Sequence, residues 1–303
     1  MEDIEAAFNH TGVTDPPGHG SGLYFRNGAQ GVVKRADIHE NDAVECGGGI
    51  RLDDAPTHVA VSDSQIYDNQ ALCGGGISVN QGSLTLADSE VESNFATGES
   101  GNGGGLHITD GGRIDVSDGV ISDNTTTDHG GAISAGNATV NITNTLITNN
   151  AATSGAANVL AAADSPVTFM NTTISDNNPT GAQAVILWGG TMTMTNSILW
   201  NSSLSLQRDC TVCSFNVNYS DIQGLAGIPD ISAGVGNFDA DPLFADQELG
   251  NYHIKPNSPC IDKGTSVGAP GSDIEGNPRT PPPDVGAYEW IGVKIFLPMV
   301  VKQ

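Results

Sequence analysis

The sequence predicts an all-β fold: a right-handed, single-stranded parallel β-helix, which is a solenoid of about eight coils with a C-terminal cap. Three observations predict it. An asparagine motif returns at regular intervals, alternating apolar residues precede most copies of the motif, and a glycine cluster follows each of the first four copies. A chain that repeats one short unit in this way stacks each unit on the previous one and forms a rod.

The recurring motif is an aliphatic residue, two variable residues and an asparagine, with one residue dropped in the last copy. Successive asparagines are separated by 28, 25, 30, 26, 27 and 24 residues, a period typical of repeat architectures. Asparagine tolerates left-handed backbone conformations and hydrogen-bonds to nearby main chain, so a tight turn is expected at the same corner of every coil. This ladder comprises Asn41, Asn69, Asn94, Asn124, Asn150, Asn177 and Asn201.

Short strands are expected before these turns, because apolar residues recur two positions apart and period two places them on one face of a strand. No segment keeps a convincing helical period, and the glycines would weaken a helix. Equivalent strands would pair in parallel from coil to coil, and crossovers between parallel strands are right-handed. The apolar pairs are Val59/Val61, Leu84/Leu86, Ile114/Val116, Val140/Ile142, Val167/Phe169 and Met192/Met194.

A second ladder of Asp and Asn residues lies five or six positions before the first. One interpretation is a row of tight turns. The other is a calcium row or a catalytic set, since carboxylate oxygens suit hard cations. The turn interpretation is favoured, because amides replace half of the carboxylates. The members are Asp63, Asp88, Asp118, Asn144, Asn171 and Asn196.

Four of the five cysteines are candidates for disulfides. Cys46 and Cys73 each precede a triple glycine, so the solenoid register places them on neighbouring coils within disulfide reach. Cys210 and Cys213 form a CxxC motif, for which a loop disulfide is favoured over a redox pair or half of a zinc site, since no second CxxC and no βαβ context accompany it. Cys260 is left over. Two bridges would imply an oxidising compartment.

The chain carries 11 Lys and Arg against 35 Asp and Glu, a net charge of −24. This charge opposes binding to nucleic acid or to anionic membranes, and it tolerates calcium and neutral or cationic glycans. The acidic start of the chain has no apolar core, so no signal peptide is visible. Because the repeats begin almost at once, we expect an export signal, and further coils, upstream of the sequence.

The repeats resemble those of polymorphic outer membrane proteins and related right-handed β-helix surface proteins of bacteria. The resemblance rests on the asparagine motif together with Gly47-Gly48-Gly49-Ile50, Gly103-Gly104-Gly105-Leu106 and Gly130-Gly131-Ala132-Ile133, and it covers roughly Gly22 to Gly224. It implies a secreted or cell-surface protein of bacterial type.

The C-terminal part resembles the choice-of-anchor Q module that follows β-helix repeats in secreted bacterial surface proteins. The matching segments are 241–244, 252–264, 273–279 and 284–289. Such a module would cap the open end of the solenoid. Its charged residues would form either an ion-pair network, which Arg279 favours, or a calcium site with Asp262, Asp273 and Asp284 as ligands.

Four regions follow from these patterns. Residues 1–16 are a lead-in or a truncated preceding coil, residues 17–230 are the β-helix repeats, residues 231–290 are the capping module, and residues 291–303 are an apolar tail. The tail is too short to span a bilayer. It resembles the C-terminal sorting tails of exported bacterial proteins, and it would also suit an edge strand, with Pro298 confining it to the rim.

Parallel β-helices include pectate lyases and polygalacturonases, so an enzyme has to be considered. Between Leu52 and Gln207 the sole Lys or Arg is Arg113, whereas a lyase of this fold needs basic residues. Adjacent carboxylates of the second ladder would satisfy the spacing of a glycosidase pair, but the turns already account for them. His107 and His129 follow or precede glycine clusters and are candidates for adjacent coils. No catalytic residue is assigned.

Sugar contacts are the remaining feature. Trp188, Trp200 and Trp290 are candidates for stacking on sugars, although the first two lie in strand-like runs that a core also accepts. The outward strand positions are too mixed for the threonine array of an ice-binding surface: Ala60, Thr85, Asp115, Asn141, Thr168 and Thr193.

The sequence therefore predicts a secreted or cell-surface structural or adhesive rod that binds glycans or associates with itself. The alternatives are a polysaccharide-cleaving enzyme of the pectin-lyase-like fold and an extracellular filament subunit. No nucleic-acid partner and no membrane span are expected.

Overall fold

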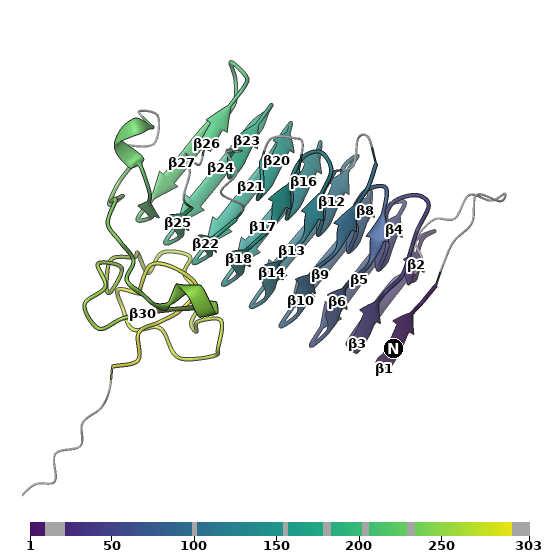
Figure 1. Ribbon diagram of the computed structural model, residues 1–303, viewed down its shortest axis with the longest axis horizontal. Helices are drawn as coiled ribbons and strands as arrows, with labels where there is room; N and C mark the ends of the chain where they lie inside the picture. The colour runs from purple at the N-terminus through teal and green to yellow at the C-terminus, as the bar shows by residue number, and fades with distance from the viewer. Residues whose placement is uncertain are drawn as a thin grey trace, which may run out of the picture.

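The computed structural model describes residues 1–9, 22–98, 102–153, 157–177, 183–201, 206–228 and 234–292. In Figure 1 the strands lie across the long axis of a rod, with β1 at one end and the C-terminal module beside the last coils. Across these ranges the chain forms four sheets. Three of them build the rod, and the fourth is the two-stranded antiparallel sheet of β29 (Phe244–Asp246) and β30 (Asn251–Ile254) in the C-terminal module. Two short 3₁₀ helices, η1 (Leu225–Gly227) and η2 (Gln247–Leu249), complete the described structure. No helix in them has the length and apolar character needed to cross a bilayer.

Each coil passes through four faces, which we number in chain order. The first and second faces form one continuous 16-stranded sheet, because the long strand β3 pairs with both β5 and β6. The first face contains β3 (Gln30–His39), β5 (His58–Ser62), β9 (Ser83–Ala87), β13 (Arg113–Ser117), β17 (Thr139–Thr143), β21 (Ser165–Met170), β24 (Gly190–Thr195) and β27 (Ser214–Asn218). The second contains β1 (Glu2–Ala7), β6 (Gln65–Tyr67), β10 (Glu90–Glu92), β14 (Val120–Ser122), β18 (Leu146–Thr148), β22 (Thr173–Ser175), β25 (Ile198–Trp200) and β28 (Asp221–Ile222).

The third and fourth faces are separate parallel sheets. The third contains β7 (Gln70–Ala71), β11 (Phe95–Ala96), β15 (Thr125–Thr126) and β19 (Ala151–Ala152). The fourth contains β2 (Leu23–Phe25), β4 (Ile50–Asp53), β8 (Ile77–Asn80), β12 (Leu106–Thr109), β16 (Ile133–Gly136), β20 (Leu160–Ala163), β23 (Val185–Leu187) and β26 (Leu206–Arg208). Stacking these eight strands takes about seven turns, and the predicted parallel β-helix is confirmed.

Parallel pairing in register places equivalent residues on top of one another, and this builds the core. Leu84 lies between Val59 and Ile114, and Val91 lies between Ile66 and Ile121. All six predicted apolar pairs point inward, with exposures of 3% or less. Burial of such a continuous stack is the main source of stability in a solenoid, where each coil contacts its neighbours alone.

The asparagine ladder is buried and hydrogen-bonded from coil to coil. Asn94 is representative. Its Oδ1 accepts the backbone N–H of Asn69 at 3.0 Å and the Nδ2–H of Asn69 at 3.0 Å. Its Nδ2 donates to the carbonyl of Ile66 at 2.9 Å and to Oδ1 of Asn124 at 3.0 Å. The ladder also has a member that the sequence motif did not reveal, Asn9, whose Nδ2 donates to Oδ1 of Asn41.

The two ladders use different physical devices. At the corner of the first ladder, the residue before the asparagine adopts the left-handed conformation in the six coils from Asn41 to Asn177, as in Asp68 at φ 52° and Asp123 at φ 56°. The expectation of left-handed asparagines there was therefore wrong. In the second ladder the predicted residues themselves adopt φ between 47° and 54°. Asn and Asp suit this role because they tolerate the conformation.

The ladder leads to a stability prediction. Asn124→Ala should lower the free energy of unfolding by about 3 kcal/mol, because it leaves the buried N–H of Asn94 and the carbonyl of Val91 without partners. The matched control Asp123→Asn changes an exposed neighbour and should cost about 0.5 kcal/mol or less. Urea unfolding of the two variants measures the difference. Equal stability of both variants would contradict the role given to the ladder.

Candidate functional site

The second ladder divides the rod into an open part and a covered part. Asp63 and Asp88 are exposed, whereas Asn144, Asn171 and Asn196 are 1% exposed or less. The reason is that the C-terminal module lies over the amide half of the ladder. The Nδ2 groups of these asparagines donate to the carbonyls of Ser272 at 2.7 Å, Asp284 at 3.2 Å and Thr265 at 2.8 Å. A carboxylate has no proton to donate to a carbonyl, so this half requires amides.

A second row shows the same division. The first residues of the second-face strands are stacked in register, and the row begins with Gln65 and Glu90 and continues with Val120 and Leu146. From Val120 onward the row packs against the module. The buried cluster between the two contains Leu146, Ile198, Phe244, Tyr252, Ile254, Cys260 and Val285. The module therefore docks on the flank of the rod, whereas the sequence placed it over the last coil.

The end of the last coil is covered by the first described residues of the predicted capping region 231–290. Backbone hydrogen bonds join β28 and its neighbours to residues 235–238, including the Ile222 N–H to the Phe238 carbonyl at 2.9 Å. Below this segment lies a buried polar pair, Asp221 and Cys260, both 0% exposed. The thiol donates to Oδ2 of Asp221 at 3.4 Å, and the Ala240 N–H donates to Oδ1 at 3.1 Å. Burial raises the pKa of Asp221 to about 7.

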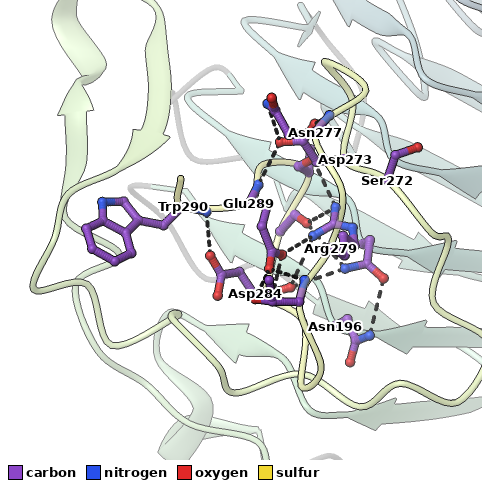
Figure 2. Close-up of polar contacts among 12 residues, drawn as sticks. Asn196, Ser272, Asp273, Asn277, Arg279, Asp284, Glu289 and Trp290 are labelled. Atoms are coloured by element: carbon purple, nitrogen blue, oxygen red, sulfur yellow. Dashed lines mark hydrogen bonds and ion pairs between the residues drawn. The ribbon is translucent and has the colours of Figure 1, made fainter. Parts of the chain in front are cut away.

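Arg279 holds the module together and joins it to the rod, as Figure 2 shows. Its guanidinium, 3% exposed, pairs with Glu289 at 3.3 Å and donates to Oδ1 of Asn144 at 2.9 Å. It also donates to the carbonyls of Gly286 and Ala287, each at 3.0 Å. Burial lowers the pKa of Arg279, and the charge of Glu289 opposes that shift. Of the predicted ion-pair network, the described residues contain the pair of Arg279 with Glu289.

Two of the three calcium candidates, Asp273 and Asp284, have buried carboxylates in the same network, whereas Asp262 is exposed and contributes its backbone N–H. Asp273 accepts the backbone N–H groups of Asn277 and Glu289 at 2.8 and 2.9 Å. Asp284 accepts those of Asp262 and Trp290 at 2.8 and 2.6 Å. Burial raises the pKa of Asp284 to about 6. Because N–H donors already occupy these oxygens, the ion-pair interpretation is favoured, and calcium binding stays a prediction.

The acidic half of the second ladder borders a groove between the first and second faces. The groove has a volume of about 380 Å³, and its lining includes Asp37, Asp63, Asp88 and Glu90. Partial burial raises the pKa of Asp88, and the neighbouring charges of Asp118 and Asp63 raise it further. A second groove begins at Asp88 and Glu90 and ends at Ile274, Glu275 and Tyr288 of the module.

The predicted disulfides are both present, Cys46–Cys73 and Cys210–Cys213. Cys46 and Cys73 lie on adjacent coils with their Cα atoms 4.5 Å apart. The disulfide lies beside outward residues of the fourth face. There Arg51, 9% exposed, binds both oxygens of Asp53 at 2.9 to 3.0 Å, and the Tyr24 hydroxyl donates to Asp53 at 2.7 Å.

His107 belongs to the same face. Burial, together with the positive charge of Arg51, lowers the pKa of His107 to about 4. His107 stacks on Ser78 and Ser134, while His129 stacks on Asn102, so the two histidines occupy different rows of the coil.

The flat outer side of the first face changes character along the rod. Near the N-terminus it carries charges, including Lys34 and the ion pair of Arg113 with Asp115 at 2.6 Å. On β17, β21, β24 and β27 no outward residue is charged, and each is at least partly exposed. We call this surface the threonine face: Thr139, Asn141, Thr143, Pro166, Thr168, Met170, Thr191, Thr193, Thr195, Ser214, Asn216 and Asn218.

The three tryptophans lie elsewhere. Trp188 stands at the fourth face with its ring 4.9 Å from that of His129, in a T-shaped contact. Trp200 packs against the module cluster, and Trp290 is 36% exposed. Sugar contacts on the threonine face would therefore be made by hydroxyl and amide groups.

The geometry agrees with the comparisons. Residues 7–121 match the family model described as "Right handed beta helix region". The crystal structure of pectate lyase Pel9A matches with a TM-score of 0.51 and 15% identity over 94% of this chain and 69% of that chain. No curated protein matches the sequence. At this identity the likeness shows the fold alone, and it defines the class: a right-handed parallel β-helix protein with a pectate-lyase-like fold.

A first prediction concerns docking of the module. Arg279→Met leaves the buried carboxylate of Glu289 without its partner, a loss of about 3–5 kcal/mol. We expect proteases to cleave residues 239–292 while the solenoid stays resistant. Limited proteolysis with mass spectrometry measures this. The exposed Lys255→Met is the control and should behave like the native chain. A module that stays resistant in Arg279→Met would refute the role of this ion pair.

A second prediction concerns pH. The folded pKa of Asp221, about 7, exceeds the ordinary value of 3.8, so its contribution to stability is fully present below about pH 4 and is lost as the pH rises through 7. Asp221→Asn should stabilise the protein at pH 8 by up to about 4 kcal/mol and change little at pH 4. Thermal unfolding at both pH values measures this. The exposed Asp246→Asn should leave the pH dependence unchanged. An equal slope in Asp221→Asn and native protein would refute the assignment.

Proposed function

We propose that this chain is a secreted or cell-surface β-helix protein that binds a neutral polysaccharide on the threonine face. The observation that carries the proposal is the absence of charge on this face, across twelve exposed or partly exposed outward positions, in a chain of net charge −24. Hydroxyl and amide groups form hydrogen bonds with sugar hydroxyls. On an uncharged face, no charged side chain has to lose its water when an uncharged ligand binds.

The geometry of the face suits an extended, flat partner. Equivalent residues recur about every 4.8 Å across the strands and about every 6.7 Å along each strand, since alternate residues point outward. The hydroxyls of Thr168 and Thr193 make no hydrogen bond to another residue within the described ranges, and they remain available to a ligand. Thr191 and Ser214 are already paired at 3.1 Å, which orients their hydroxyls.

Two further observations support an extracellular location. Both disulfides require an oxidising compartment. The resemblance of the repeats and of the C-terminal module to bacterial surface proteins supports the same location. A rod with a docked module presents the threonine face as a rigid surface, as an adhesin requires.

The acidic groove supports a second candidate, hydrolysis of a polysaccharide. A glycosidase needs a protonated carboxyl group and a carboxylate on opposite sides of the scissile bond. The grooves bring Asp88 close to Asp63 and Asp118, and partial burial raises the pKa of Asp88, which is the direction that a proton-donating carboxyl group requires. The binding function is preferred, because the same three residues also form left-handed turns.

Binding to insoluble polysaccharides tests the main proposal. The native chain should sediment with a neutral polymer such as cellulose, chitin or β-1,3-glucan, and not with polygalacturonate. Thr168→Glu combined with Thr193→Glu should weaken retention about tenfold or more, since it places two carboxylates in the contact. The matched control, Ala60→Glu with Thr85→Glu, adds the same charges to the same row on β5 and β9 and should bind normally. No retention on any neutral polymer, or equal loss in both variants, would overturn the proposal.

Release of reducing ends from the same polymers tests the second candidate. If the native chain cleaves a polymer, Asp88→Asn should abolish cleavage and Asp115→Asn, which lies outside the groove, should not. No cleavage by the native chain, or cleavage that survives Asp88→Asn, would exclude the acidic groove as an active site.

A further inference from the structure

Three metal-binding side chains converge beside the glycine clusters. Ligand atoms of Cys46, Cys73 and His107 all lie within 4.8 Å of one another. Among the described residues this is the one group of three such side chains that is compact enough to hold a single ion. Cysteine and histidine are the ligands that soft and borderline metals prefer, above all Zn²⁺.

The residues come from three successive coils. Cys46 and Cys73 stack at the corner before the fourth face, and His107 is the outward residue of β12, one strand beyond Ser78 of β8. Gly74 brings them together. A Cβ atom at Gly74 would lie 3.1 Å from the His107 Cβ and 2.5 Å from the carbonyl oxygen of Ile77. A side chain at position 74 would therefore separate the imidazole from the sulfur atoms.

Within the described structure, the Nδ1 atom of His107 is buried and has no hydrogen-bond partner. An unpaired buried nitrogen is costly unless something fills its coordination position. Arg51 also contacts this corner. Its Nη1 donates to the carbonyl of Cys46 at 3.3 Å, and its guanidinium pairs with Asp53 at 2.9 Å and Glu45 at 3.8 Å.

We propose that the Cys46–Cys73 disulfide masks a Cys₂His site for Zn²⁺, which opens when the disulfide is reduced. A dithiol reductant supplies two electrons and two protons, so the S–S bond breaks, two thiols form, and the reductant becomes a disulfide. Zn²⁺ then displaces both thiol protons and binds two thiolates and the imidazole, with a fourth position open to solvent. The site is thus a redox-gated metal site, separate from the threonine face.

Cobalt binding tests this proposal, because Co²⁺ reports thiolate ligation by its near-ultraviolet charge-transfer absorption. The experiment uses the full chain carrying Cys210→Ser and Cys213→Ser, so that the second disulfide contributes no thiolates. After reduction with a phosphine, Co²⁺ should produce the absorption, and Zn²⁺ should displace it. The unreduced chain should show no absorption. His107→Gln should weaken Co²⁺ binding tenfold or more, whereas the matched variant His129→Gln should not.

A protection experiment on the same background needs no histidine variant. In the reduced chain, Zn²⁺ should slow alkylation of Cys46 and Cys73 by iodoacetamide, as measured by mass spectrometry on each peptide, and a chelator should reverse the effect. The proposal is overturned if the reduced chain gives no thiolate-to-cobalt absorption, if His107→Gln folds and binds as tightly as His129→Gln, or if Zn²⁺ leaves alkylation of both cysteines unchanged.

Discussion

The buried stack of asparagine amides fixes the register on which the rest of the structure depends. The amides from Asn41 to Asn150 each bind two backbone groups and the amide of a neighbour, so a slip of one coil by one residue would leave several buried polar groups without partners. Parallel strands alone do not set a register this firmly, because one aliphatic residue packs on another at many positions. With the corner fixed, the first, second and fourth faces bring their outward residues into straight rows, and every surface of functional interest is such a row.

The rows also explain how the C-terminal module selects its position. Where the rod is open, the second ladder is acidic and the adjacent row begins with Gln65 and Glu90. Where the module docks, the ladder becomes amide and the row becomes Val120 and Leu146. Arg279 then binds Asn144 across the boundary while it neutralises Glu289 inside the module. In this buried interface the side-chain amides of the ladder both accept and donate hydrogen bonds. Stacked carboxylates would repel one another and would leave the backbone carbonyls of the module without donors.

The sequence was sufficient for features that repeat in register and insufficient for those that do not. The asparagine corner, the apolar pairs and the Cys46–Cys73 contact all follow from the spacing of successive coils. The second ladder switches from aspartate at Asp118 to asparagine at Asn144, and this switch marks where the module docks. A turn accepts either residue, so the sequence did not reveal the meaning of the switch until the structure showed what the asparagines bind. His107 occupies a different position in its coil from the cysteines, so spacing alone did not predict their contact. Asn9 lacks the aliphatic residue of the motif, so spacing alone did not predict that it belongs to the ladder.

Stacking also constrains where a solenoid carries its charge. Like charges on neighbouring strands face each other at about 4.8 Å, and such pairs are destabilising. Partial burial raises the pKa of Asp88, and repulsion from Asp118 and Asp63 on the neighbouring coils raises it further. The fold nevertheless accepts charge on the first face, since Arg113 lies in the same row as Thr191 and Asp115 lies in the same row as Thr193. Stacking therefore does not require the threonine face to be neutral, and the proposed contact with an uncharged polysaccharide accounts for the absence of charge over four successive coils.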